Sequence, residues 1–205
     1  MAGLPARIRA LYDDLQPLQS LEPAGHLVRD VRGPDRVDWH YRHSGDRQHA
    51  HQGAPLGGRR KRGIFREAIG RSRGGRTTKI HALTDAAGRP HVLLLSPGNT
   101  NDIALAPALI AAVGPIKRLI ADKAYDANRL RQLLADRGAK AVIPSTASRN
   151  RPIPYNKKIY RQRNVIERMF ARLKDFRRVA TRYDKLARNF LAGALIVATL
   201  VWWLN

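Results

Sequence analysis

The sequence predicts an α/β domain in which a mixed sheet is flanked by helices, preceded by an irregular basic N-terminal region. Short apolar segments alternate with helical ones from Thr77 to the end of the chain, and this alternation is typical of such a sheet. Residues 39–62, in contrast, show no hydrophobic period that could pack, so we expect most of this stretch to be loop or disordered. We therefore expect an irregular region over 1–62 and one domain over 63–205.

Four strands are predicted in the domain. Residues 77–84 alternate as a strand, residues 85–88 have the composition of a hairpin turn, and residues 91–95 form the return strand. Two short apolar strands follow over 118–121 and 140–143, each ended by a residue that stops extended structure. The predicted sheet therefore contains one hairpin, over 77–95, and two further strands that are not joined by a tight turn.

Four helices are predicted around these strands. Asp102 and Asp126 are the expected N-caps of the first two, because an aspartate side chain accepts hydrogen bonds from first-turn N–H groups. The helices are expected over residues 103–112, from the Asp126 cap to Asp136, over residues 159–179 and over residues 185–204.

The charge balance indicates a polyanionic partner. Lys and Arg number 38 against 16 Asp and Glu, a formal charge of +22. Nucleic acid is the first candidate partner and an anionic membrane surface the second. The absence of cysteine excludes disulfides, thiol catalysis and cysteine-ligated zinc. The apolar run over 190–204 has 15 residues, short of the ~20 that a bilayer requires, so we expect a buried C-terminal helix.

Asp122 is the first candidate for chemistry. It follows an apolar strand directly and precedes a helix, and ligands in open α/β sheets gather at the carboxyl ends of strands. An isolated aspartate in this position is also a common turn or capping residue. Position alone leaves both interpretations open.

The predicted long helix carries a polar stripe. Tyr160, Arg163, Glu167 and Lys174 fall within roughly 60° of one another at about 100° per residue. An apolar flank beside the stripe is expected to face the core, and it consists of Ile159, Ile166, Phe170 and Leu173. Such a helix can line a cleft, although an ordinary solvated helix with an Arg163–Glu167 pair fits the spacing equally well.

Two separated carboxylates in a very basic chain suggest metal-assisted phosphoryl chemistry. Mg²⁺ prefers oxygen ligands and takes few protein carboxylates, with substrate phosphates completing its shell. Two such ions ~3.5–4 Å apart can activate an attacking oxygen and stabilise a leaving one. A third carboxylate upstream is normally needed to bridge them.

Several motifs together resemble DDE-type insertion-sequence transposases. Residues 68–82 (AIGRSRGGRTTKIHA) and 121–126 (ADKAYD) look like signature blocks of that family. The spacing Y-x2-R-x3-E-x6-K over 160–174 matches its C-terminal signature without gaps, and 181–185 (TRYDK) is similar to its ending. The resemblance covers residues 65–205.

This resemblance implies an RNase H-like fold and Mg²⁺-dependent (or Mn²⁺-dependent) DNA cleavage and strand transfer at transposon ends. It also implies that Asp122 and Glu167 are the second and third catalytic, metal-binding carboxylates. Asp35, Asp38 and Asp46 are all candidates for the first carboxylate. Asp38 is the best of them, because it stands 32 residues before Gly70, which is the family's spacing. The residues after Asp38 lack the aliphatic strand of the family, and we hypothesise that residues 1–62 are in part a truncated or frame-shifted remnant.

The expected partner is double-stranded DNA, bound in the bacterial cytoplasm at the nucleoid by a homodimer, with no membrane association. The residues expected to contact DNA are Arg71, Arg73, Arg76, Lys79, Tyr160, Arg163 and Lys174. The competing function is a non-enzymatic basic protein that binds nucleic acid through phosphate contacts, and a peripheral membrane protein ranks third. Because the surroundings of Asp38 look unable to hold a carboxylate in a working position, we expect poor strand transfer.

Overall fold

The computed structural model describes residues 37–44, 67–72 and 75–204, and it describes side chains in the last two of these ranges. The compact unit to which they belong starts at Arg36. The irregular structure expected over 1–36 and 45–62 lies outside the described residues.

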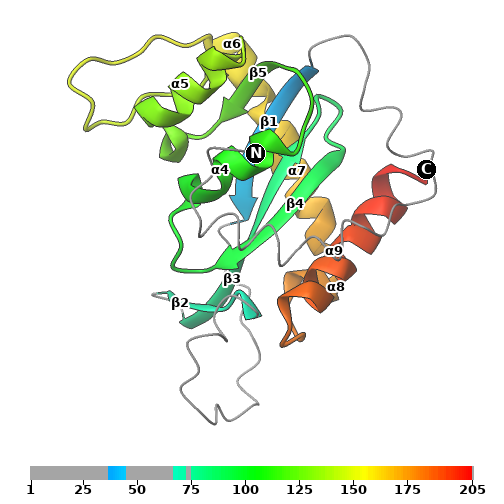
Figure 1. Ribbon diagram of the computed structural model, residues 1–205. Helices are drawn as coiled ribbons and strands as arrows, with labels where there is room; N and C mark the ends of the chain where they lie inside the picture. The colour runs from blue at the N-terminus through cyan, green and yellow to red at the C-terminus, as the bar shows by residue number, and fades with distance from the viewer. Residues whose placement is uncertain (1–36, 45–66, 73–74, 205) are drawn as a thin grey trace. The chain divides into compact units, whose positions relative to one another are not determined.

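The described strands form one mixed sheet in the order β4-β3-β1-β5-β6, with the short β2 paired to β3 (Figure 1). β1, β3 and β4 pair antiparallel, whereas β5 runs parallel to β1 and β6 parallel to β5. This arrangement of three antiparallel strands and two parallel ones is that of an RNase H-like sheet, so the expected fold class is confirmed. The strands are β1 (Val37–Ser44), β2 (Gly70–Ser72), β3 (Gly75–Thr84), β4 (Pro90–Pro97), β5 (Ile116–Ala121) and β6 (Lys140–Val142).

The central strand β1 is the clearest departure from the sequence prediction. Loop was expected over 39–62, and for residues 39–44 this expectation is wrong. A central strand is held by backbone hydrogen bonds along both edges, so it can form without a run of aliphatic residues. Val37, Trp39 and Tyr41 alternate in the sequence and are residue types that favour strands. This period of two was the signal available for predicting β1.

Helices cover the sheet, with α4 in front of it and α7 behind it in the view of Figure 1. α7 contacts β1, and α9 contacts β4. The helical elements are η2 (Asp102–Leu105), α4 (Ala106–Ala111), η3 (Lys123–Tyr125), α5 (Asn128–Asp136), α6 (Lys157–Tyr160), η4 (Arg161–Arg163), α7 (Asn164–Lys174), α8 (Arg177–Ala180) and α9 (Ala187–Trp202). In the described part of the chain, none of them is long and apolar enough to cross a membrane.

The helix expected over 159–179 is divided. It begins in the short helix α6, continues through the 3-10 turn η4 into α7, and is separated from α8 because Phe176 adopts an extended backbone with ψ of 104°. The apolar flank predicted for the helix is buried in α7 at Ile166, Phe170 and Leu173. The prediction that this flank faces the core is therefore confirmed for these three residues, although the helix is interrupted.

The two expected N-caps are wrong, and in both cases a lysine or arginine competes for the aspartate. Asn101 accepts the first-turn hydrogen bond of η2, while Asp102 forms an ion pair at 2.5 Å with Lys79. Ala127 occupies the N-cap position of α5, and the carboxylate of Asp126 is used elsewhere. Charge-assisted bonds are the stronger alternative to a neutral capping bond.

Arg182 closes the domain at its C-terminal end. It is 1% exposed and donates hydrogen bonds to Thr78 Oγ1, to the carbonyl of Glu67 at 2.6 Å and to the carbonyl of Lys185 at 3.0 Å. Burial lowers the pKa of Arg182 to about 10. The segment before α9 is thereby tied to β3 and to the chain that enters β2.

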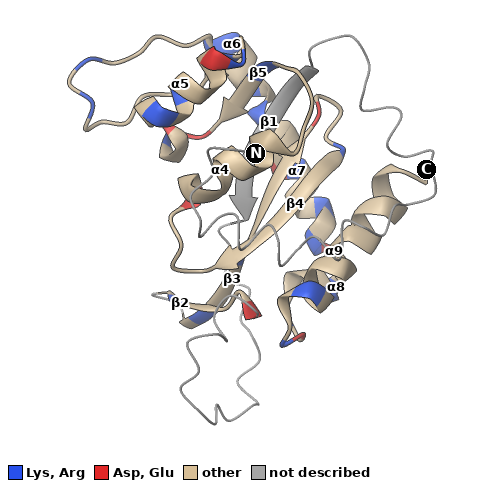
Figure 2. Cartoon of the chain, in the orientation of Figure 1, with Lys and Arg blue, Asp and Glu red and all other residues tan. Residues whose placement is uncertain are grey.

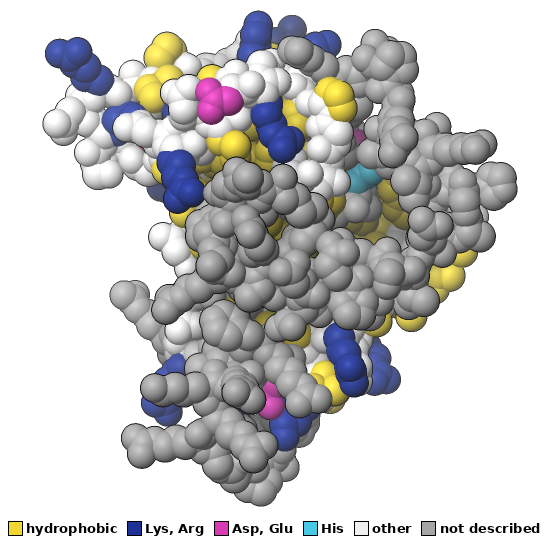
Figure 3. All heavy atoms as spheres, in the orientation of Figure 1, with side chains coloured by type: hydrophobic (Ala, Val, Ile, Leu, Met, Phe, Trp, Pro, Cys, Tyr) yellow, Lys and Arg dark blue, Asp and Glu magenta, His cyan; other side chains and the backbone are white. Residues whose placement is uncertain are grey.

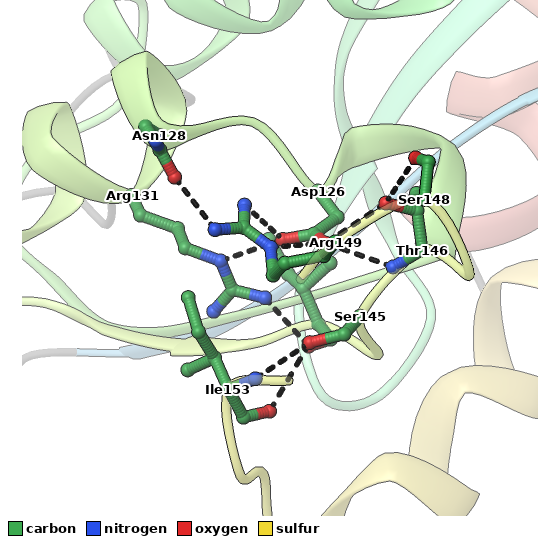
Figure 4. Close-up of polar contacts among 9 residues, drawn as sticks. Asp126, Asn128, Arg131, Ser145, Thr146, Ser148, Arg149 and Ile153 are labelled. Carbon is green, nitrogen blue, oxygen red and sulfur yellow. Dashed lines mark hydrogen bonds and ion pairs between the residues drawn. The ribbon is translucent and has the colours of Figure 1, made fainter. Parts of the chain in front are cut away.

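Asp126 joins three segments that surround the carboxyl end of β5 (Figure 4). Its carboxylate accepts hydrogen bonds from Arg131 Nε at 2.8 Å, from Arg149 Nε at 2.9 Å and from the backbone N–H of Thr146 at 2.8 Å. The side chain of Asp126 is fully buried. Arg149 and Thr146 belong to the loop over 144–156, so this loop is fastened to the turn that follows Asp122.

Burial raises the pKa of the Asp126 carboxyl, but the hydrogen bonds from Arg149, Thr146 and Arg131 outweigh it and lower the pKa to about 2. A folded-state pKa below the unfolded value of about 3.8 means that the charged carboxylate stabilises the fold. That contribution is complete above pH 4 and is lost as the pH falls to about 2, and it amounts to about 2 kcal/mol.

We predict that Asp126→Asn lowers the free energy of unfolding by about 2 kcal/mol at pH 7, because two arginines lose their carboxylate. The difference from wild type should shrink as the pH falls from about 4 to about 2, where the wild-type carboxylate is protonated. Urea denaturation between pH 7 and pH 2.5 measures it. Asp136→Asn, which alters a carboxylate bonded to the exposed Gln132 amide, is the matched control. A pH-independent difference would contradict the prediction.

Candidate active site

Asp122 stands at the carboxyl end of β5, as predicted from the sequence. The strand before it ends in the buried residues Leu119, Ile120 and Ala121. Its side chain is 39% exposed and accepts a hydrogen bond from the backbone N–H of Lys123 at 2.6 Å, which starts the turn η3. A rigid strand end thus presents an accessible carboxylate.

The residues that follow Asp122 in the chain anchor the turn η3. Tyr125 is completely buried at the end of η3, and Asp126 is held by Arg131 and Arg149. The backbone on both sides of Asp122 is therefore anchored in the core. A carboxylate whose backbone is held in this way is pre-organised for binding, because little conformational freedom is lost when it takes a ligand.

Glu167 reaches the same place from the helical layer. η4 contacts β5, and α7 continues from η4 across β1. Arg163 Nη2 lies 2.7 Å from Glu167 Oε1, and Arg163 Nη1 lies 3.9 Å from Asp122 Oδ2. With about 2.3 Å between the two ends of a guanidinium, these contacts place the two carboxylate oxygens within about 9 Å of each other.

Tyr160 completes this part of the site. Its ring lies under the Arg163 guanidinium, 5.6 Å from ring centre to Cζ, and meets the ring of Tyr155 edge to face at 5.3 Å. Burial raises the pKa of the Tyr160 phenol, so the hydroxyl stays protonated at neutral pH. Three of the four residues of the predicted stripe are in contact or close together here, and the fourth, Lys174, is the last residue of α7.

Asp38 lies on β1, the strand next to β5. Its Cα is in register with Arg118, whereas Tyr41 is in register with Ala121, the residue before Asp122. Asp38 is therefore four residues back from the level of Asp122, or roughly 13 Å along the strands at about 3.3 Å per residue. The register does not bring Asp38 beside the pair formed by Asp122 and Glu167.

The chemistry of the donor set, two carboxylate side chains, suits a hard divalent cation. The part of the chain that the structure describes contains no cluster of three or more His, Cys, Asp or Glu side chains. Asp122 and Glu167 nevertheless offer oxygen ligands that are 39% and 40% exposed, and a guanidinium already occupies the space between them. A cation with few protein ligands and a phosphate from the substrate suits such a pair.

The residues predicted to contact DNA divide into two groups. Arg71 and Arg76 are exposed and lie directly opposite each other in the β2–β3 pair, where Gly75 has a φ of +104° and open space around it. Arg73 lies outside the described residues. Lys79 is bound to Asp102 and to the carbonyl of Thr100 at 2.7 Å, and its side chain is 20% exposed, so its ammonium is already paired within the fold.

Asp126, Arg131 and Arg149 are the positioning residues that sequence reasoning missed. Asp126 was read as a helix cap because it precedes a helix, and its two arginines come from positions 5 and 23 residues further along the chain. The carbonyl of Ile143 also accepts from Arg131, at 2.9 Å. The one sequence feature that could have indicated this role is that Asp126 belongs to the 121–126 block, which resembles a family signature.

Two curated proteins are similar in sequence to this chain. A protein assigned as the transposase of insertion sequence element IS6501 from Brucella ovis is 33% identical over 127 residues, covering 62% of this chain and 98% of that protein. One assigned to element IS402 from Burkholderia cepacia is 32% identical over 137 residues, and the match spans 62% of this chain and 63% of the relative.

Two solved structures are distantly similar. The catalytic core domain of BIV integrase has a TM-score of 0.46 at 17% identity, covering 83% of this chain and 86% of that one. The piggyBac transposase in a synaptic complex has a TM-score of 0.49 at 12% identity, covering 95% of this chain and 51% of that one. The sequence model of the transposase DDE domain matches residues 35–202, and the chain therefore belongs to the DDE-domain transposase family.

Proposed function

We propose that this chain is the catalytic domain of an insertion-sequence transposase, which binds the ends of its element as double-stranded DNA and acts on them with Mg²⁺ or Mn²⁺. One observation carries the proposal: Asp122 and Glu167, which are 45 residues apart in the sequence, meet at the two ends of the Arg163 guanidinium. Paired carboxylates in a chain of net charge +22 suit phosphoryl transfer on a polyanion.

In this proposal Asp122 and Glu167 hold the metal, and each comes from a different layer of the fold. A bound Mg²⁺ or Mn²⁺ would neutralise charge on the scissile phosphate and favour the attacking oxygen. Asp122 is fixed by the turn η3, and Glu167 is fixed by a helix whose other face is buried. The chain's own contribution is to position these two carboxylates, with Tyr160 and Arg163 beside them.

Asp38 is the candidate for the first carboxylate of the family, and its position leads to a further part of the proposal. Its register position lies four residues back from Asp122, so Asp38 is not at the same level of the sheet as the pair. Metal-dependent strand transfer depends on positions held to within ~0.5 Å. We therefore propose that this chain binds DNA but transfers strands poorly.

The proposed DNA surface is made of exposed arginines and lysines (Figure 2). Arg71 and Arg76 form one part of it, at the β2–β3 pair. Two like charges directly opposite each other on neighbouring strands destabilise that pair unless an anion lies between them. The larger part lies on and around α6–α8 and contains the exposed residues Arg151, Lys157, Lys158, Arg161, Arg168, Arg172, Arg177, Arg178, Lys185 and Arg188.

We also propose a homodimer, acting at the nucleoid in the cytoplasm, with α9 as the contact between copies. α9 buries Phe190, Leu191, Ala194 and Ala198, yet Ile196 and Leu200 on its opposite side are 61% and 49% exposed. Figure 3 shows hydrophobic side chains at the right-hand edge, where Figure 1 places α9. The expected burial of this helix therefore holds for one face.

Charge favours a second copy as the occupant of the exposed face. Residues 189–205 contain no charged side chain. On a chain of net charge +22, an uncharged apolar helix is a surface where two copies can approach without repulsion between like charges. A helix that is apolar all round is typically buried on all sides.

The first prediction concerns catalysis. With DNA carrying the element's ends and Mg²⁺ or Mn²⁺, the wild type should give weak strand transfer or none, and Asp38→Ala should change nothing. Any residual cleavage should be lost in Asp122→Ala and Glu167→Ala, which remove the metal-binding pair. Gel analysis of cleaved and joined products measures this. Robust turnover lost in all three variants would establish Asp38 as a catalytic carboxylate. Salt-sensitive binding with no metal effect would favour a non-enzymatic DNA-binding protein.

The second prediction concerns DNA affinity. Because each neutralised phosphate contributes about −0.9 to the slope of log affinity against log salt, Arg71→Ala with Arg76→Ala should flatten the slope by about 2. Fluorescence anisotropy with a labelled duplex at several salt concentrations measures it. Arg129→Ala, an exposed arginine on α5 outside the proposed surface, is the control and should leave the slope unchanged. Equal effects of both changes would argue against a localised surface.

The third prediction concerns the dimer. Ile196→Glu with Leu200→Glu should convert a dimer into a monomer, because it places charge on the apolar contact. Analytical ultracentrifugation measures the mass, and Ala171→Glu, at an exposed position on α7, is the control. A monomeric wild type would contradict the proposal. Binding of the wild type to anionic vesicles, lost in the α9 variant, would identify a membrane as the occupant instead.

A further inference from the structure

Arg163 occupies the place between the two carboxylates proposed to bind metal. Its Nη2 is close to Glu167 Oε1, at 2.7 Å, whereas its Nη1 is 3.9 Å from Asp122 Oδ2. The side chain is 22% exposed. One end of the guanidinium therefore forms a tight ion pair and the other a loose one, inside a partly enclosed site.

The loose end is unsatisfied. Nη1 is buried and makes no hydrogen bond to the residues that the structure describes. A buried donor left without an acceptor costs about 1–3 kcal/mol. A ligand that accepts a hydrogen bond from Nη1 would therefore lower the free energy of the site. A planar guanidinium binds a phosphate through two parallel hydrogen bonds, which would satisfy both of its ends.

Helix stability gives little reason for the pair. Arg163 precedes Glu167 by four residues, and the order with the acid first is the more favourable one on a helix. The partner that distinguishes Arg163 from an ordinary helical ion pair is Asp122, which comes from the sheet. The arginine thus bridges two layers of the fold at the site itself.

We infer that Arg163 is an exchangeable internal cation. In the absence of metal it holds Asp122 and Glu167 together, and when a divalent cation binds the two carboxylates the guanidinium is released and pairs with a DNA phosphate. This inference rests on the proposed function of the site. It couples the two ligands, because metal binding frees the group that binds DNA and DNA binding removes the group that competes with metal.

Removal of Arg163 changes the metal affinity in a direction that depends on the role of this residue. If Arg163 competes with the metal, its removal strengthens metal binding in the absence of DNA, because a positive charge a few ångströms from the ion is gone. If Arg163 merely holds the site in shape, its removal weakens metal binding. The two roles therefore predict opposite changes for the same variant.

The experiment measures Mn²⁺ binding to the full chain by electron paramagnetic resonance, without DNA. Arg163→Gln should bind Mn²⁺ about fivefold more tightly than the wild type. Arg163→Lys, which keeps the charge, should stay near the wild type. Arg168→Gln, at an exposed arginine of α7, is the matched control and should also stay near the wild type. Asp122→Asn, added to Arg163→Gln, should abolish the gain and so locate the ion. Thermal melts establish that each variant is folded.

A second measurement tests the coupling. At constant ionic strength, Mn²⁺ should raise the DNA affinity of the wild type by a larger factor than that of Arg163→Gln, in which only the contact between the metal and a phosphate remains. Weaker Mn²⁺ binding by a folded Arg163→Gln, or equal coupling in both proteins, overturns the inference and leaves the metal site standing. If neither protein binds Mn²⁺ in a manner that depends on Asp122, the proposed metal site fails and the inference fails with it.

Discussion

The buried carboxylate of Asp126 is the point at which the segments around the site are joined. It binds Arg131 from α5, and Arg149 and Thr146 from the loop over 144–156. That loop leads directly into α6, η4 and α7, which carry Tyr160, Arg163 and Glu167. One ion cluster therefore ties the turn after β5 to the loop that leads into the helical half of the site. Loss of this cluster would affect both carboxylates. Asp122 belongs to the turn that contains Asp126, and Glu167 follows the loop that Asp126 binds.

Several of the few acids in this chain form ion pairs within the fold. In the described part of the chain, the acids within ion-pair distance of a basic side chain are Asp85, Asp102, Asp122, Asp126, Glu167 and Asp184. Asp85 and Asp126 are buried by their partners, and hydrogen bonds lower the pKa of each to about 2 despite burial. The internal ion pairs thus use a few basic residues, and many other arginines and lysines of the described residues are exposed and available to a polyanion.

What the sequence could predict depended on how local the determining interactions are. The hairpin of β3 and β4, the strand before Asp122 and the buried flank of α7 follow from residue periods, and all are present. The strand β1 was missed because long-range backbone pairing holds it. Asp102 and Asp126 were assigned to caps because their arginine and lysine partners lie far away in sequence. The spacing of Arg163 and Glu167 indicated a pair, but their approach to Asp122 depends on how η4 packs against β5.

Arg182 has a consequence for the order in which the chain is made. Its acceptors, Thr78 and Glu67, precede it by 104 and 115 residues. During synthesis from the N-terminus the whole sheet emerges before the residue that locks β3 to the segment preceding α9, and α9 comes last. The nascent domain therefore has an unlocked sheet until the final part of the chain is free. A chain cut short before residue 182 would contain every described strand but would lack these hydrogen bonds between β3 and the segment preceding α9.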